Sequence, residues 1–219
     1  MNMGMSMPSW YDIKGLDVKS NEQCDGIEIS QSRLAGILQT EHETTGLPYS
    51  RMVLAGFSQG GALSLYTGMQ LPSSSQKLAG IVVLSGYLPQ QSKFQITPGL
   101  EDTPILHCHG TQDPVVMYPL AQLTQKALTT IKGATNYELK SFPVQHTVSL
   151  DEIQAVEQFL LKLLPPDDSC KITVKEPHTM SIKELKAAIK KAGLSNQAVG
   201  FMEKSEFINL LQNHRDGKL

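Results

Sequence analysis

The serine at position 58 lies in a pattern that can make a hydroxyl group reactive. It stands in the order Gly56-Phe57-Ser58-Gln59-Gly60, after the apolar run 52–55 and before a segment with helical apolar spacing. A serine hydroxyl is a weak nucleophile unless a sharp strand-to-helix turn presents it to a neighbouring base. A side chain at Gly56 or Gly60 is expected to clash where strand and helix pack together. The pattern predicts a nucleophile elbow at Ser58, and the alternative is an idle serine on a glycine-rich turn.

A catalytic serine needs a histidine to accept its proton and an acid to orient that histidine. Asp113 follows the apolar run 104–109, and His146 follows a second run that ends at Phe142. If these runs are parallel strands, their carboxyl ends lie at the same edge of the sheet as Ser58. The order serine, aspartate, histidine along the chain is that of the α/β-hydrolases. We therefore predict Ser58 as nucleophile, Asp113 as orienting acid and His146 as base.

Two other histidines, His107 and His109, flank Cys108 in the run before Asp113. Successive residues of a strand face opposite sides of a sheet, so the cysteine cannot join the histidines around a metal ion. The pattern favours buried, hydrogen-bonded histidines over metal ligands, and it favours an inert core thiol at Cys108. The three cysteines of the chain are widely spaced and show no metal-ligand spacing. No metal and no cofactor is expected.

Apolar runs and helical spacings alternate from about residue 27 to residue 165. This alternation predicts a doubly wound α/β fold whose functional loops lie at the carboxyl ends of the strands. Ser149 and Glu152 form a capping box for the last helix of this part. Polar and apolar residues alternate in the last strand, which places it near a sheet edge. The expected strands are 52–55, 78–84, 104–109 and 136–142. The expected helices are one from residue 27 that Gly46 and Pro48 close, one directly after Ser58, and those at 120–131 and 149–164.

Composition places the chain among ordinary globular proteins. Of its 219 residues, 40% are hydrophobic and 18% are charged, and no apolar run is long enough to span a membrane. The start shows no secretory signal pattern, and the widely spaced cysteines favour a reducing compartment, so a cytoplasmic location is expected. The net charge of −2 divides into −6 for residues 1–170 (10 Lys and Arg against 16 Asp and Glu) and +4 for residues 171–219 (9 against 5). This division indicates a separate C-terminal unit.

Several segments resemble the acyl-protein thioesterase family, whose members are lysophospholipase-like carboxylesterases. The resemblance runs from about residue 1 to residue 166, with the motifs in family order. It implies an α/β-hydrolase of lipid metabolism that cleaves thioesters of S-palmitoylated proteins, lysophospholipids or small acyl esters through a serine acyl-enzyme. The resembling segments are Pro8-Ser-Trp-Tyr-Asp-Ile13, Gly56-Phe-Ser-Gln-Gly-Gly-Ala-Leu-Ser-Leu-Tyr66, Leu84-Ser-Gly-Tyr-Leu-Pro89, His109-Gly-Thr-Gln-Asp-Pro-Val115 and Leu163-Leu-Pro-Pro166.

The resemblance also implies roles for single residues. The serine, aspartate and histidine named above fall on the family's nucleophile, acid and base. The backbone amide of Gln59 would supply one donor of the oxyanion hole. By the same resemblance, Tyr87, Leu88 and Val115 would line the acyl channel.

One part of the family pattern does not precede Ser58. Family members have an N-terminal third with several strands and a His-Gly-Leu-Gly-Asp loop that gives the second oxyanion donor, whereas no His-Gly segment comes before Ser58. We therefore expect an N-terminally truncated sheet that lacks the N-terminal strands, an unpaired edge beside the strand of Ser58, and impaired turnover. The alternative function is that of a catalytically impaired hydrolase remnant that acts as a protein- or nucleic-acid-interaction module through its C-terminal helices.

The C-terminal segment 181–214 shows a second pattern. Ser181 and Glu184 make another capping box, and the apolar spacings within 185–194 and 207–211 predict two short helices. The arrangement resembles the helix-loop-helix of SAP-like modules, which can bind nucleic acid. A charge of +4 without an arginine cluster favours a protein-contact or packing role instead. The predicted organisation is an α/β-hydrolase domain at 1–166, a linker at 167–180 and a small helical unit at 181–214.

Overall fold

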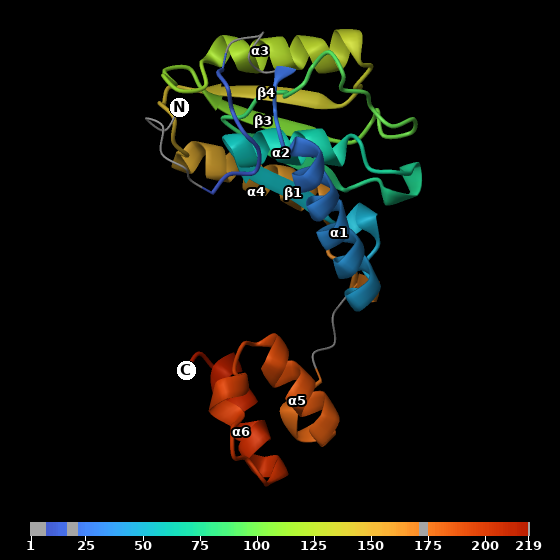
Figure 1. Cartoon of the computed structure of the whole chain (residues 1–219), viewed down its shortest axis with the longest axis vertical. Helices are drawn as coiled ribbons and strands as arrows, with labels where there is room; N and C mark the ends of the chain where they lie inside the picture. Colours follow the sequence, from blue (N-terminus) through green and yellow to red (C-terminus); the bar gives the residue numbers. More distant parts are fainter. Residues whose placement is uncertain (1–7, 17–21, 171–174, 219) are drawn as a thin grey trace. The chain divides into compact units, whose positions relative to one another are not determined.

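The structure is a computed structural model that describes residues 8–16, 22–170 and 175–218. Internal contacts divide the chain into two compact units, Met1–Asp167 and Asp168–Leu219, and each is described by itself (Figure 1). Part of the segment predicted as a linker, residues 171–174, lies outside the described residues. The strands and helices that position the candidate site all belong to the first unit.

Four parallel strands form the sheet of the first unit, in the spatial order β1-β2-β3-β4. They are β1 (Val53–Phe57), β2 (Gly80–Leu84), β3 (Ile105–Gly110) and β4 (Tyr137–Phe142). The two central strands are buried almost throughout, as expected for apolar runs that are covered on both faces. β4 is partly exposed and lies at one edge, and β1 forms the other edge among the described residues. The predicted strands and their parallel pairing are confirmed.

The register of the sheet brings the carboxyl ends of the strands together. Phe57 of β1 lies opposite Leu84 of β2, and Leu84 lies opposite Cys108 of β3. Gly110, two residues further along β3, pairs with Phe142 at the end of β4. The loops that leave β1, β3 and β4 therefore start along the same edge, where an open parallel sheet places its functional residues.

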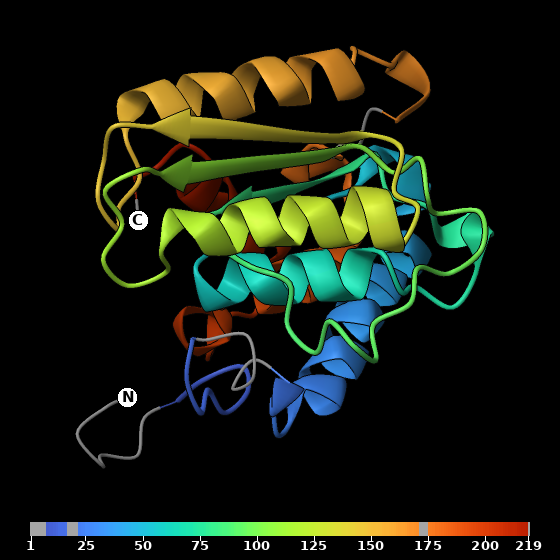
Figure 2. The same ribbon diagram turned by 90° about the horizontal axis from the view of Figure 1, so that it is seen from above.

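Helices cover both faces of the sheet. α1 (Ile27–Thr45), α2 (Gln59–Gly68) and α3 (Tyr118–Lys126) lie on one face, and α4 (Leu150–Leu163) lies on the other (Figure 2). α3 continues as a short π-helical segment, Ala127–Ile131. α2 is buried after its first two residues because it packs against β1, β2 and α1. The result is the layered α/β architecture that the sequence predicts.

Two glycines allow α2 to start directly at the end of β1. A Cβ added to Gly56 would overlap the carbonyl group of Gly60 and lie 2.5 Å from the amide nitrogen of Gly61. A Cβ added to Gly61 would lie 2.7 Å from the carbonyl oxygen of Gly56. At Gly60, an added Cβ would meet only Trp10 Nε1, at 3.8 Å, so the prediction that Gly60 is needed for space is wrong. The crowded pair is Gly56 and Gly61, because the first turn of α2 folds back over the end of β1.

α4 begins at the predicted capping box. The Ser149 hydroxyl accepts a hydrogen bond from the Glu152 amide (3.2 Å), and the Glu152 carboxylate accepts one from the Ser149 amide (2.8 Å). Further along the helix, Ala155 packs in one apolar cluster with Leu106 and Cys108 of β3. The helix therefore closes the second face of the sheet immediately after the loop that follows β4.

Among the described residues of the second unit, the α-helices are α5 (Ile182–Lys191) and α6 (Lys204–Arg215). The Ser181 hydroxyl accepts a hydrogen bond from the Glu184 amide (3.3 Å), so the predicted capping box starts α5. An apolar core of its own is the feature that characterises a domain. The buried residues of this core are Met180, Leu185, Ile189, Leu194, Phe207, Leu210 and Leu211.

Candidate active site

Ser58 joins β1 to α2, and its backbone adopts an unusual conformation. Its φ is +54° and its ψ is −120°, a region that residues with a side chain rarely occupy. The Ser58 amide extends the strand pairing by donating to the Leu84 carbonyl (2.7 Å), while the Ser58 carbonyl accepts from the Ala62 amide in α2 (3.0 Å). Strand pairing and helix thus hold a strained residue in place, as in a nucleophile elbow.

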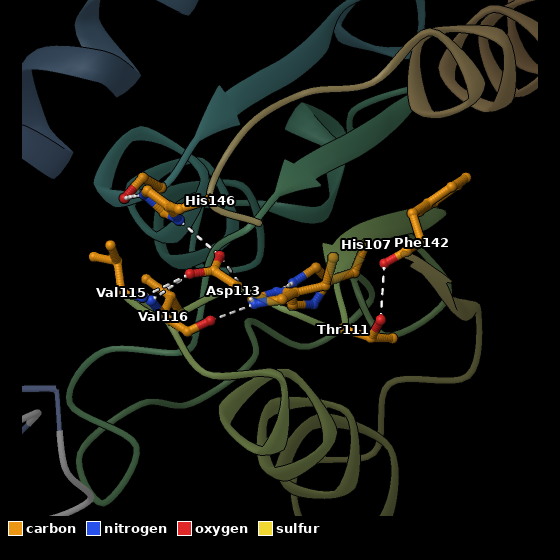
Figure 3. Close-up of polar contacts among 9 residues, drawn as sticks. His107, Thr111, Asp113, Val115, Val116, Phe142 and His146 are labelled. Carbon is orange, nitrogen blue, oxygen red and sulfur yellow. Dashed lines mark hydrogen bonds and ion pairs between the residues drawn. The ribbon is translucent and has the colours of Figure 1, made fainter. Parts of the chain in front are cut away.

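Asp113 is held in the loop after β3 by backbone donors. Its Oδ1 accepts hydrogen bonds from the amides of Val115 (2.8 Å) and Val116 (2.9 Å). The amide and the hydroxyl of Thr111 both donate to the Phe142 carbonyl (2.7 and 3.2 Å), which fixes the loop to the end of β4 (Figure 3). The carboxyl group is 0% exposed, and its Oδ2 remains available for a third donor.

His146 lies between Asp113 and Ser58. Its Nδ1 is 2.7 Å from Asp113 Oδ2 (Figure 3), and its Nε2 is 3.0 Å from Ser58 Oγ. A carboxylate only accepts hydrogen bonds, so the ring hydrogen lies on Nδ1 and the Nε2 lone pair faces the serine hydroxyl. The ring of Phe57 packs against the imidazole, with centroids 4.7 Å apart. This arrangement can move the serine proton to His146 while Asp113 balances the charge that forms.

The side chain and the backbone of Gln59 face different partners. Side-chain Oε1 accepts from the Trp10 amide (3.1 Å), and Nε2 donates to the Tyr11 carbonyl (2.7 Å). The backbone amide belongs to the first turn of α2, where N–H groups have no partner within the helix. Such amides suit a negatively charged oxygen. The side chain therefore fixes residues 10–11 beside the elbow, while the amide lies in the first turn of α2.

The three residues predicted to line an acyl channel lie in different environments. Val115 is 45% exposed in the loop that carries Asp113. Tyr87 and Leu88 are buried, and the Tyr87 hydroxyl accepts a hydrogen bond from that of Tyr11 (2.9 Å). Both line a cavity of about 20 Å³, which has room for one water molecule but not for an acyl chain. The structure thus brings the side chain of Val115, but not those of Tyr87 and Leu88, to the surface.

Within residues 8–16, 22–170 and 175–218, no group of three or more histidine, cysteine or acidic side chains is placed to hold a metal ion. His107 and His109 are buried, and the rings hydrogen bond to each other (3.1 Å from Nε2 to Nδ1), as the strand pattern favours. Burial raises the pKa of the Cys108 thiol to about 12, which keeps it protonated and unreactive. In the same described ranges, no helix combines the length and the apolar character needed to cross a membrane.

Two contacts of the site involve residues to which the sequence motifs assign no role in it. Phe57 packs on the imidazole of His146, and His109 Nε2 lies 2.7 Å from the carbonyl oxygen of Val116 in the Asp113 loop. In the sequence, the signals for these two contacts are the position of Phe57 next to Ser58 and that of His109 four residues before Asp113. Only the register of the sheet and the path of the loop show what these side chains face.

A parallel sheet between helices, with a serine on a strained strand-to-helix turn and an aspartate–histidine pair at the same edge, defines an α/β-hydrolase. A family model described as Phospholipase/Carboxylesterase matches residues 1–164. The chain belongs to this family, which confirms the resemblance seen in the sequence and makes the protein a serine hydrolase of acyl esters and thioesters.

Curated relatives with similar sequences are acyl-protein thioesterases by name. Acyl-protein thioesterase 1 of Neurospora crassa is 39% identical over 174 residues, which cover 75% of this chain and 69% of that protein. Acyl-protein thioesterase 1 homolog 1 of Dictyostelium discoideum is 35% identical over 165 residues (75% and 72%). Among solved structures, SOBER1 of Arabidopsis thaliana has a TM-score of 0.62 at 27% identity and covers 74% of this chain and 77% of its own. Acyl-protein thioesterase 2 of Zea mays has a TM-score of 0.59 at 26% identity (71% and 72%).

Proposed function

We propose that the chain hydrolyses acyl thioesters and esters through a covalent acyl-enzyme on Ser58. The observation that carries this proposal is the hydrogen-bonded row from Ser58 Oγ through His146 to Asp113, with distances of 3.0 and 2.7 Å. The row is assembled from loops that follow three different strands, and this order of groups is the machinery of acyl transfer. In the proposed reaction, Ser58 is the nucleophile, His146 the base and Asp113 the acid that orients it.

In the first half-reaction, Ser58 Oγ attacks the acyl carbonyl carbon while its proton moves to His146 Nε2. The carbonyl oxygen becomes an oxyanion, and the backbone amide of Gln59 donates a hydrogen bond to it at the start of α2. His146 then gives the proton to the departing thiolate or alkoxide as the carbon–sulfur or carbon–oxygen bond breaks. The products are a free thiol or alcohol and an acyl ester of Ser58.

In the second half-reaction, a water molecule takes the place of the serine hydroxyl. His146 Nε2 accepts a proton from the water, whose oxygen attacks the acyl carbon, and Ser58 Oγ departs and regains a proton from the ring. Asp113 does not take the proton itself: its two amide donors hold the carboxylate in place, where it accepts the Nδ1 hydrogen and orients the ring. The released product is a carboxylic acid.

The proposed substrate is an acyl group carried on the thiol of a modified protein, with lysophospholipids and small acyl esters as further substrates. The names of the relatives support this substrate class. In the chain itself, the partly exposed side chains of Phe57 (39%) and Val115 (45%) offer apolar surface to an acyl chain beside the triad. Tyr87 and Leu88 contact the acyl chain in this proposal only when their small cavity widens on binding.

We propose different tasks for the parts of the chain. The hydrolase domain is 1–166, the linker is 167–180 and the helical unit is 181–214, and the separate core of α5 and α6 supports this division. For the helical unit we propose contact with protein rather than nucleic acid, because residues 171–219 contain one arginine and their nine Lys and Arg are offset by five Asp and Glu. A cytoplasmic location remains our proposal from the cysteine spacing.

The test is labelling of the purified chain with a fluorophosphonate, together with hydrolysis of a p-nitrophenyl ester and a palmitoyl thioester. We expect labelling of Ser58, and we expect Ser58→Ala to lose labelling and hydrolysis together. Ser64→Ala is the matched control, because Ser64 is a buried serine six residues later in α2. The control should keep both properties. A folded wild-type chain that is neither labelled nor active would overturn the proposal and favour a role in binding other molecules.

A further inference from the structure

A row of hydrogen-bonded side chains leads from β4 to the loop of Asp113, and Figure 3 shows its part between His107 and Asp113. Tyr137 of β4 contacts His107 of β3, with 2.6 Å between the hydroxyl oxygen and Nδ1. The other nitrogen of His107, Nε2, is 3.1 Å from Nδ1 of His109, and Nε2 of His109 is 2.7 Å from the Val116 carbonyl oxygen. Both rings are 0% exposed. The row ends on the loop that holds Asp113.

The Val116 carbonyl sets the direction of every hydrogen bond in this row. A carbonyl oxygen only accepts, so the hydrogen of His109 lies on Nε2 and its Nδ1 carries a lone pair. His107 then donates from Nε2 to that lone pair, and its own Nδ1 accepts from the Tyr137 hydroxyl. The other tautomer of either ring would break two of these bonds at once.

Both rings are held neutral, which leaves one hydrogen on each. Burial and the neighbouring His109 lower the pKa of His107 to about 3, and the Gly86 carbonyl opposes this shift. Burial is also the largest cause that lowers the pKa of His109, against the opposing effects of the Val116 carbonyl and of Asp113. The fixed direction of the row follows from this neutral state, because a doubly protonated ring cannot accept a hydrogen bond.

The row ends where the loop of Asp113 closes on itself. The Val116 amide donates to Asp113 Oδ1 (2.9 Å), and the carbonyl of the same residue accepts from His109 (2.7 Å). His109 Nε2 also lies 3.7 Å from Asp113 Oδ2, the oxygen that faces His146. Through Val116, His109 therefore ties β3 to the backbone amide that holds the carboxylate.

We propose that His109 is a positioning residue for Asp113, and that Tyr137 and His107 act on it by fixing its tautomer. This inference rests on the proposed role of Asp113 in the triad. His109 is not one of the reacting groups, and it acts by keeping Asp113 Oδ2 within hydrogen-bonding distance of His146 Nδ1. A small misplacement of such a group is enough to lower turnover on the order of 10²-fold.

A purely structural role for His107 and His109 would give different results from a positioning role. If the row only satisfies buried polar groups, its loss lowers the thermal midpoint and leaves kcat of the folded protein unchanged. If the row positions Asp113, its loss lowers kcat while KM changes little, because the carboxylate acts on the base and not on substrate binding. The position of the His146 ring hydrogen changes only in the second case.

The experiment compares the full chain with His109→Leu, His109→Gln and Leu106→Ala. Glutamine keeps a donor and an acceptor at the end of its side chain, whereas leucine offers neither. Leu106 is the matched control, because it is equally buried in β3 on the opposite face of the sheet. For each form we would measure kcat and KM on a p-nitrophenyl ester, the thermal midpoint, and the proton NMR resonance of the hydrogen on His146 Nδ1.

We expect His109→Leu to lower kcat on the order of 10- to 100-fold with little change in KM, and to shift or abolish the His146 resonance. His109→Gln should restore most of kcat and the resonance. Leu106→Ala should lower the thermal midpoint and leave kcat and the resonance as in the wild type. If His109→Leu does not fold, His107→Leu carries the test, because it removes the donor that fixes the His109 tautomer; a smaller loss in the same direction is expected.

Unchanged kcat and an unchanged resonance in folded His109→Leu would overturn the inference, and so would equal losses in Leu106→Ala. Failure of the proposed function looks different. In that case the wild type is inactive, or Ser58→Ala stays active. The resonance still reports then whether His109 positions Asp113 against His146, because it needs no turnover.

Discussion

The two sides of the candidate site are held in place by different forces. Ser58 is fixed by steric crowding, because Gly56 and Gly61 approach so closely that neither can carry a side chain without movement. Asp113 is fixed by hydrogen bonds from two backbone amides, and a buried row of polar side chains stands behind them. Crowding tolerates no added atom, whereas a hydrogen-bonded loop tolerates any group that restores the same donor and acceptor.

This difference determines what disturbs each side. Backbone packing does not titrate, so the elbow around Ser58 has no cause to respond to pH. The loop of Asp113 depends on two buried histidines that are neutral when folded. Substitutions and changes of pH should therefore affect the elbow of Ser58 and the loop of Asp113 differently.

The largest effect on kcat is expected at Asp113, whose carboxylate contacts His146. Asp113→Asn keeps an oxygen for the two amides but presents an N–H donor to His146, which moves the ring hydrogen to Nε2. The ring then cannot take the proton of Ser58, so kcat should fall on the order of 10⁴-fold in a folded protein. Steady-state kinetics and near-ultraviolet circular dichroism measure both properties.

The control for this variant is Asp102→Asn. Asp102 is an exposed acid paired with Lys77 (2.5 Å), outside the site. It should leave kcat unchanged. If Asp113→Asn kept kcat within about tenfold of the wild type, Asp113 would not be the orienting acid.

The next effect concerns the crowded side. Gly56→Ala forces the elbow apart and should lower the free energy of unfolding by about 3 kcal/mol or more. Gly60→Ala meets free space and should change it by less than about 1 kcal/mol. Urea denaturation of the two variants measures the difference. Equal losses would mean that crowding does not hold Ser58 in place.

Low pH should lower the free energy of unfolding through the buried histidines beside the loop of Asp113. The folded pKa of His107 is about 3, below the unfolded value of about 6.5, so the unfolded chain binds more protons between these values. The free energy of unfolding therefore falls as the pH is lowered through this window, by up to about 1.4 kcal/mol per pH unit for this group. Above pH 6.5, neither the folded nor the unfolded chain gains a proton at His107, so its contribution to the pH dependence of stability vanishes. His109, whose pKa is also lowered, acts in the same direction.

Urea denaturation between pH 7 and pH 4 tests this effect by comparison of variants. Asp113 and Glu152 lie near His109 and oppose its shift, whereas His146 adds to it, so the informative quantity is the difference in slope. His107→Gln should show a shallower loss of stability with falling pH than the wild type. Leu106→Ala, which removes no titratable group from β3, should be less stable but keep the wild-type slope. Parallel curves for all three proteins would contradict a neutral buried His107.

The smallest effect is expected at the far end of the polar row. Tyr137→Phe removes one donor to His107 and should lower the free energy of unfolding by about 1 kcal/mol. The change in kcat should be much smaller than in His109→Leu, because Tyr137 acts on His109 only through His107, whose Nε2 donor remains. Kinetics and urea denaturation on the same preparation give both numbers. A loss of kcat as large as that of His109→Leu would mean that Tyr137 acts on Asp113 by another route.

The crowded side was largely predictable from the sequence. Glycines around Ser58 and an apolar run before it specify a strand, a turn and a helix through local sterics alone. The same holds for the capping box of Ser149 and Glu152, since its two hydrogen bonds span three residues. The mistake about Gly60 shows the limit of this reasoning: the motif gives the spacing of the glycines, but only the path of α2 shows that Gly61 makes the close contact.

The polar side was predictable only in part. Asp113 and His146 follow predicted strands, and that position is enough to propose them. The row of Tyr137, His107 and His109 depends on strand register, because Tyr137 of β4 pairs with Ile105 of the adjacent strand β3 and contacts His107, two residues further along β3. Helix faces show a similar limit. Leu150 and Ile153 are apolar residues within the predicted helix 149–164 but are 80% and 51% exposed, since α4 meets the sheet through the side that carries Ala155.

The wide sequence spacing of the site has a consequence for how the protein acquires activity. Ser58 and His146 are 88 positions apart, and the hydrogen bond from Gln59 to Tyr11 spans 48 positions. Contacts of this kind form late in folding, because the entropy of closing long loops must be overcome before they stabilise the chain. During refolding, the helical circular-dichroism signal should return before ester hydrolysis does. The rate at which hydrolysis returns would then measure the rate at which the tertiary structure is completed.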